Sequence, residues 1–253
     1  MNSQSRFKIF IALLAAITIG WCVPMVALAA WKTLGPGIMY QDLSPIYIRD
    51  WSHIHVFKID PNLSTFELVQ QKQIEKTFPS IIQYANYKKT SLAFNGGFFD
   101  NQQLPLGLRI SNYKILNRFK KISWWSVFYI ENKHPHIVYG KQFNHHSGIE
   151  FALQSGPRLV IHGKIPHLKP GLAERTALCI LPNHEIAVII TQYFPMTLTQ
   201  LGKWLTDEPL QCIDAINLDG GSSTQLFAKF SGFYLHMPGL ASVSDAITVM
   251  PRS

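Results

Sequence analysis

Short apolar or alternating segments bounded by turn residues dominate the chain, and this pattern is the strongest constraint on its fold. Three pairs of segments follow it: 54–59 with 65–69, 125–130 with 136–139, and 176–181 with 185–191. Turn residues such as Asp60-Pro61-Asn62 separate the members of each pair, which predicts three β-hairpins. The near-continuous apolar run around Ile189-Ile190 is typical of a central strand covered on both faces.

Helical signals are fewer. Residues 78–87 carry Pro79 near a first helical position, and residues 198–205 follow Thr197, a suitable N-cap. No linker or repeat interrupts the chain after its first thirty residues. The expected fold class is therefore α+β, a single domain with an extensive mixed or antiparallel sheet and a few packed helices.

Composition excludes several classes of protein. The chain has 253 residues, of which 47% are hydrophobic and 15% charged, so it can bury a core and is not disordered. Its formal charge of +8 raises the question of nucleic acid. The basic residues are scattered, however, with Lys88-Lys89 and Lys120-Lys121 as the longest runs, and no nucleic-acid motif is present. We therefore predict no nucleic-acid partner.

The first 29 residues have the order of a secretory signal. Arg6 and Lys8 precede an apolar run, and Ala27-Leu28-Ala29 provides the small residues of a cleavage site. We predict a signal peptide at 1–29, a mature domain at 30–253, and a periplasmic or secreted protein. The alternative is an uncleaved segment that anchors the chain, which would be its only membrane contact.

Two cysteines, Cys179 and Cys212, follow the predicted cleavage site, each in an apolar context. An oxidising compartment permits a disulfide between them, whereas apolar surroundings are also typical of buried free thiols. Both outcomes stay open at the level of sequence.

Two glycine-rich stretches, 92–100 and 216–224, each follow an apolar strand. The first strand ends in Asn95-Gly96-Gly97 and the second in Asp219-Gly220-Gly221. Paired glycines allow close backbone approach, so their N–H groups can converge on an anion, although the same pairs also form ordinary tight turns. Arg158 and Arg175 each begin an apolar strand, where a guanidinium group can bind phosphate or pair with a nearby carboxylate.

Five motifs in this order closely resemble the phosphodiester glycosidase family. They are Asn-Gly-Gly-Phe-Phe, Pro-x-Gly-Leu at 105–108, Gln-Ser-Gly-Pro, Glu-Arg-Thr-Ala and Asn-Leu-Asp-Gly-Gly-Ser-Ser. The similarity extends over residues 92–249. It implies an enzyme that hydrolyses a sugar linked through its anomeric oxygen to a phosphodiester, as a small molecule or as part of a polymer.

The resemblance gives these residues roles. Asp219 is expected to act as base or nucleophile, Asn95 to orient the sugar or the water, and Arg175 and Arg158 to neutralise the phosphate. Further substrate-binding candidates are Gly96, Gly97, Ser155, Gly156, Thr176, Gly220, Gly221, Ser222 and Ser223.

We predict no metal and no cofactor. A hard cation such as Ca²⁺ or Mg²⁺ held by Asp219, Asn95 and Asp100 is the open alternative. The alternative function is a non-catalytic module that binds envelope glycans or anionic polysaccharide, with Trp124-Trp125 as part of a sugar-stacking surface.

Overall fold

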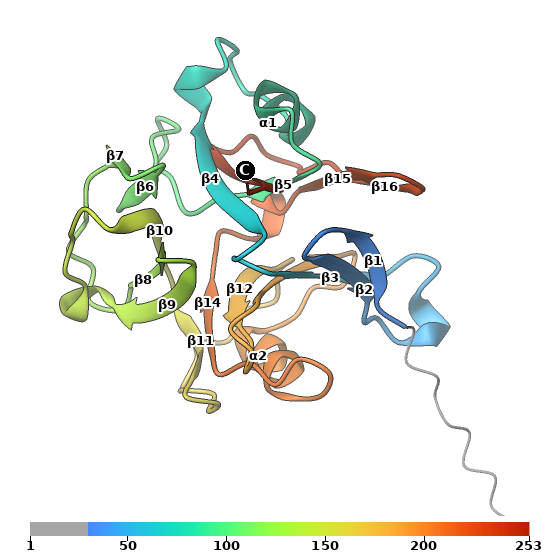
Figure 1. The fold of residues 1–253 in the computed structure, drawn as a ribbon. Coiled ribbons are helices and arrows are strands. Elements are labelled where there is room, and N and C mark those ends of the chain that lie inside the picture. The colour runs from blue at the N-terminus through green and yellow to red at the C-terminus, as the bar shows by residue number, and fades with distance from the viewer. Residues whose placement is uncertain (1–29, 253) are drawn as a thin grey trace, which may run out of the picture.

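The computed structural model describes residues 30–252, so the predicted signal peptide lies outside the described part of the chain. Within that part the strands form three sheets, and every strand pair is antiparallel (Figure 1). The first is a seven-stranded sheet in the order β1 (Lys32–Gly35), β2 (Ile38–Asp42), β3 (His53–Ile59), β13 (Ile186–Gln192), β12 (Thr176–Ile180), β14 (Asp214–Asn217) and β11 (Arg158–Ile161).

The other two sheets have five strands each. The second sheet has the order β7 (Lys114–Asn117), β6 (Arg109–Ser111), β10 (Ile149–Ser155), β8 (Ser126–Glu131) and β9 (His134–Tyr139). The third sheet has the order β16 (Phe233–Met237), β15 (Leu226–Phe230), β5 (Leu92–Asn95), β17 (Asp245–Pro251) and β4 (Ser64–Gln70). Short 3-10 turns add η1 (Ile46–Ile48), η2 (Gln71–Gln73), η3 (Gly140–Gln142) and η4 (Gly221–Ser223).

One hydrophobic core joins the three sheets. Phe57 and Leu178 from the seven-stranded sheet, Phe128 and Phe151 from the second, and Phe94 from the third belong to the same buried cluster. The predicted antiparallel strands and packed helices are confirmed, but the single extensive sheet is in fact three sheets around this core.

Two α-helices in the described residues cover outer sheet faces. The first, α1 (Ile81–Lys88), packs Tyr84 and Ala85 against the third sheet, and α2 (Leu198–Thr206) packs Leu201 and Leu205 against the seven-stranded sheet (Figure 1). Thr197 caps α2 as predicted, whereas α1 starts after Ser80, three residues later than predicted. No helix among residues 30–252 is long and apolar enough to span a membrane.

Two of the three predicted hairpins form, and one prediction was wrong. β8 pairs with β9, and β12 pairs with β13, whose residues are buried on both faces up to Thr191. β3 and β4 do not pair: β3 joins the seven-stranded sheet and β4 pairs with β17 in the third. The turn at Asp60 does form, since Asp60 O accepts from Leu63 and Ser64, but it carries the chain from one sheet into another.

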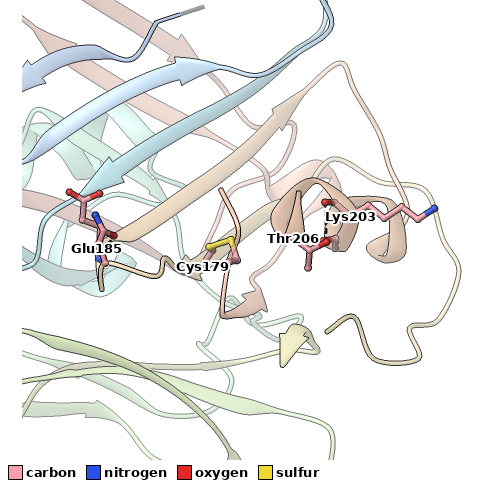
Figure 2. The surroundings of a disulfide bond; sticks show 7 residues. Cys179, Glu185, Lys203 and Thr206 are labelled. Carbon is pink, nitrogen blue, oxygen red and sulfur yellow. Dashed lines mark hydrogen bonds between the residues drawn. A yellow bond between two sulfur atoms is a disulfide. The ribbon is translucent and has the colours of Figure 1, made fainter. Parts of the chain in front are cut away.

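Cys179 and Cys212 form a disulfide, which settles the alternative that the sequence left open. Cys179 lies on β12 and Cys212 just before β14, so the bond closes a loop that contains α2. Figure 2 shows the bond near α2, where Thr206 donates a hydrogen bond to the carbonyl of Lys203 (3.2 Å).

We expect that replacing both cysteines by alanine lowers the free energy of unfolding by about 3–4 kcal/mol, because the disulfide closes a loop whose ends are 33 residues apart. Urea unfolding followed by circular dichroism measures the change. The control is the reduced wild type, which should match the double variant in the presence of a reductant. Equal stability of the oxidised wild type and the double variant would contradict the expectation.

Candidate active site

Asn95, at the end of β5, ties together strand ends from two sheets. Its Oδ1 accepts from Thr176 Oγ1 (2.8 Å) and from the backbone N–H of Gln225 (3.3 Å). Its Nδ2 donates to the carbonyls of Asp219 (2.8 Å) and Gly96 (3.3 Å). These contacts use the full hydrogen-bonding capacity of a buried amide. Both side chains thus hold the backbone around Asp219, and the substrate roles expected of Asn95 and Thr176 stay predictions.

Asp219 follows β14 and is only partly exposed. Its Oδ1 accepts from the backbone N–H of Gly220 (3.0 Å), and the Ser223 side chain also hydrogen-bonds to it. Burial raises the pKa of Asp219, and the nearby Asp245 adds to the rise, while Ser223, Gly220 and Arg109 oppose it. A carboxylate with a raised pKa in a partly buried position is suited to acid–base work.

The first glycine pair lies against a buried aspartate. The N–H groups of Gly96 and Gly97 donate to the carbonyl oxygen (3.0 Å) and Oδ1 (3.2 Å) of Asp245. A Cβ atom on Gly96 would lie 1.8 Å from Asp245 Oδ1, and one on Gly97 would lie 2.6 Å from Arg109 Nη2. These positions require glycine because the backbone passes directly over a buried ion pair, and their assignment to the substrate stays a prediction.

That ion pair, Arg109 with Asp245, is the part of the site that sequence reasoning missed. Arg109 Nε lies 2.7 Å from Asp245 Oδ2, and both side chains are completely buried. Arg109 also donates to the carbonyls of Phe98 (3.2 Å), Leu106 (2.9 Å) and Gln154 (3.2 Å). It thus connects three of the motifs found in the sequence. The available signal was a lone charge at the start of each of two apolar segments, Leu-Arg-Ile and Asp-Ala-Ile.

The second glycine pair is also engaged within the protein. Gly220 N–H donates to Asp219, and Gly221 N–H donates to the carbonyl of Glu174 (2.8 Å). A Cβ atom on Gly220 would lie 2.6 Å from that carbonyl, and Gly221 has a positive φ of 61°. Both N–H groups have acceptors within the protein, and a phosphate cradle at this pair stays a prediction. Ser223 is buried, whereas Ser222 is exposed at η4.

The two arginines differ in their surroundings. Arg175, just before β12, donates from Nε to the carbonyl of Met196 (2.8 Å) and from Nη2 to the carbonyl of Gly171. It has no carboxylate partner among residues 30–252. Burial lowers the pKa of Arg175, but a guanidinium group stays charged near neutral pH. Arg175 therefore retains a positive charge that no side-chain carboxylate offsets.

Arg158, in contrast, is already neutralised. Its buried guanidinium group forms an ion pair with Asp214 and lies 5.2 Å from the ring centre of Tyr139. The preceding residues are also used: Ser155 Oγ donates to the carbonyl of Asn217 (2.8 Å), and Asn217 Nδ2 donates to the carbonyl of Gly156 (3.3 Å). This segment packs along β14, and its assignment to the phosphate stays a prediction.

The alternative cation site gains no support from geometry. The Oδ1 atom of Asp100 accepts from the backbone N–H groups of Gln102 (2.9 Å) and Leu104 (3.0 Å), so this carboxylate stabilises its own turn. Across the described range, 30–252, no cluster of three or more His, Cys, Asp or Glu side chains has the arrangement to hold a metal ion.

Comparison with known proteins identifies the family of the chain. A model of the phosphodiester glycosidase family matches residues 88–250. The uncharacterized protein YigE of Escherichia coli (strain K12) is 28% identical over 133 residues, which are 47% of this chain and 52% of that protein. The chain thus spans about half the length of that curated relative.

Solved structures share the fold. The catalytic domain of zebrafish N-acetylglucosamine-1-phosphodiester alpha-N-acetylglucosaminidase, auto-inhibited by its pro-peptide, has a TM-score of 0.65 at 18% identity, covering 85% of this chain and 82% of that one. A hypothetical protein from Synechocystis has a TM-score of 0.61 at 16% identity, covering 88% of this chain and 63% of that one.

Proposed function

Because the chain belongs to the phosphodiester glycosidase family, we propose that it hydrolyses the bond between a sugar's anomeric carbon and the oxygen of a phosphodiester. Water adds to the anomeric carbon, the carbon–oxygen bond breaks, and a free sugar and a phosphomonoester leave. The observation that carries the proposal is the partly buried Asp219 carboxylate, held by Gly220 and Ser223, with a raised pKa. Asp219 acts as base or nucleophile at the anomeric carbon.

A single carboxylate is chemically sufficient for this reaction. Glycosidases use a second carboxylic acid to protonate the departing oxygen. A phosphomonoester is a far better leaving group than an alcohol, so it departs without that proton. Asn95, Thr176 and the two glycine pairs position Asp219 rather than touch the substrate.

Arg175 is the residue we assign to the phosphate, with the exposed Ser222 as a hydroxyl donor. The charge of Arg175 has no carboxylate partner in the described part of the chain, unlike the charge of Arg158. A guanidinium group can stabilise both the bound phosphodiester and the greater negative charge on the departing phosphomonoester.

The proposal also places the mature protein outside the cytoplasm, in a periplasm or secreted. The signal-like order of residues 1–29 supports export. The Cys179–Cys212 disulfide supports it independently, because such bonds persist in oxidising compartments.

The first experiment separates an enzyme from a binding module. The purified mature protein is incubated with a GlcNAc-1-phosphodiester and with a plain aryl glycoside, each with and without EDTA. We expect turnover of the phosphodiester alone, unaffected by EDTA. Binding of sugar phosphates without turnover of any of them would favour the module.

The activity should be lost on the acid side at a pH above the ordinary carboxyl pKa. Burial raises the pKa of Asp219 above the ordinary carboxyl value of about 3.9. The ionised form acts as base or nucleophile, so kcat/KM should fall as pH decreases through this raised pKa. A kcat/KM profile on a phosphodiester, which does not titrate in this range, measures the limit, and circular dichroism at each pH excludes unfolding. A kcat/KM that stays constant down to the ordinary carboxyl pKa would contradict the role of Asp219 as base or nucleophile.

Arg175→Lys should lower kcat/KM by about 10- to 100-fold, because lysine keeps the charge but loses the planar fork that binds phosphate. The matched control is Arg49→Lys. Arg49 is also partly exposed and donates to a backbone carbonyl, that of Ser44 (2.8 Å), but unlike Arg175 it has a carboxylate neighbour, Asp42 Oδ2 at 4.0 Å, so its replacement should leave the kinetics unchanged. Equal kinetics in both variants would return Arg175 to a structural role.

A further inference from the structure

The second sheet carries an aromatic groove that the proposed reaction does not use. Two neighbouring cavities, of about 670 and 300 Å³, share Phe119 as a wall. Tyr139 and Lys141 also line the larger cavity, and Arg118 and Phe143 line the smaller. We call these two cavities the Phe119 groove. The larger one falls within the size range of ligand pockets, about 300–1,000 Å³.

The groove is built from aromatic rings and cations. Phe119 and Phe143 stack nearly parallel, with an interplanar angle of 9° and ring centres 6.3 Å apart. Gly140 makes this packing possible, because a Cβ atom there would lie only 3.2 Å from Phe119 Cζ. Phe119 nevertheless keeps 37% of its surface exposed. An exposed ring held in place by its neighbours is a suitable stacking surface.

The charges at the groove have one sign. Arg118, Lys121 and Lys141 line the two cavities, and no aspartate or glutamate does so in the described structure. None of these three cations belongs to an ion pair between residues 30 and 252. The segment Arg118-Phe119-Lys120-Lys121 therefore places cations without carboxylate partners at the edge of an aromatic surface.

The chain segment that lines the groove leads to residues that contact the candidate active site. The segment that lines it leads into Trp124, which is 53% exposed. A Cβ atom on Gly156 would lie 3.1 Å from the carbonyl oxygen of Trp124, and the carbonyl of Gly156 accepts from Asn217 Nδ2 (3.3 Å). Asn217 precedes Asp219 by two residues. The segment that lines the groove is thus linked, through Trp124 and Gly156, to the end of β14.

We infer that the Phe119 groove binds a phosphate-bearing glycan, with sugar rings on Phe119 and Tyr139 and phosphates on Arg118, Lys121 and Lys141. The choice of a sugar phosphate polymer over other polyanions rests on the proposed function. The chain then combines hydrolysis at Asp219 with retention of a long anionic substrate on the second sheet.

The test measures binding of yeast phosphomannan and of unphosphorylated mannan, by affinity electrophoresis and calorimetry. The full mature chain carries Asp219→Asn, so that turnover does not consume the probe. We expect phosphomannan to bind more tightly than mannan, with an affinity that falls as ionic strength rises. The Lys121→Glu/Lys141→Glu variant should bind phosphomannan about 10-fold more weakly or worse. Phe119→Ala should weaken binding of both polymers.

Lys72→Glu/Lys76→Glu is the matched control, since both lysines are exposed, lie outside the groove and form no ion pair in the described residues. It should bind like the parent, and thermal unfolding confirms that all variants are folded. Equal affinity for the two polymers, or equal losses in the groove and control variants, would overturn the inference. So would tighter binding of single-stranded oligothymidylate than of phosphomannan at the same salt, which assigns the groove to nucleic acid. Absence of turnover on the small GlcNAc-1-phosphodiester refutes the proposed function instead.

Discussion

Asp219→Asn is expected to reduce turnover of a sugar-1-phosphodiester by roughly 10²- to 10⁴-fold, the range associated with loss of a positioned general base. The fold should survive, because an asparagine Oδ1 can still accept the hydrogen bond from Gly220 N–H (3.0 Å). The neutral amide also removes a carboxylate that burial disfavours, as its raised pKa indicates. The substitution therefore removes charge and basicity while keeping shape.

The measurement is kcat and KM on a GlcNAc-1-phosphodiester, with thermal unfolding of the same samples. Asp100→Asn is the matched control, since Asp100 follows the other glycine pair and accepts hydrogen bonds from two backbone N–H groups that asparagine can keep. It should retain wild-type kinetics. A folded Asp219→Asn enzyme with near-normal turnover would remove the central claim of the proposed function.

Local patterns in the sequence predicted much of the fold because their partners are close in the chain. The β8–β9 and β12–β13 hairpins and the Thr197 cap of α2 depend on residues within one short segment. The failed hairpin shows the limit of this reasoning. A turn at Asp60 fixes a change of direction, but whether β4 pairs with β3 or with β17 is decided by packing around a core shared by three sheets.

The candidate site shows the same limit in its chemistry. The glycine pairs correctly indicated close backbone approach, yet the group approached is a side chain or carbonyl of the protein itself. Gly97 meets Asp245, which is 148 residues away in sequence. Likewise Arg158 and Arg175 look equivalent at strand starts, and only the fold places Asp214 beside Arg158 and leaves Arg175 without a carboxylate. Residue type predicted the kind of contact, and the fold determined the partner.

Arg109→Met should lower the free energy of unfolding by about 3–5 kcal/mol, because it leaves a completely buried carboxylate without its counter-charge. Burial raises the pKa of Asp245, and Arg109 is the main group that lowers it. Without the arginine, Asp245 is expected to take up a proton. The carbonyls of Phe98, Leu106 and Gln154 would also lose their donor. Such a loss is a large part of the 5–15 kcal/mol typical of a domain.

Urea unfolding at neutral pH measures the effect, and Arg109→Met/Asp245→Asn provides the second arm. The double variant has no buried charge at this pair and keeps an acceptor for Gly97 N–H, so its loss should be smaller than the sum of the two single losses. Gly96→Ala should be severely destabilising for a related reason, since its Cβ atom would meet Asp245 Oδ1 at 1.8 Å. Gly35→Ala is the control, because its nearest neighbour is 3.9 Å away and its φ is not positive. Arg109→Met stability within about 1 kcal/mol of wild type, or strictly additive losses in the double variant, would mean that the pair does not hold the site together.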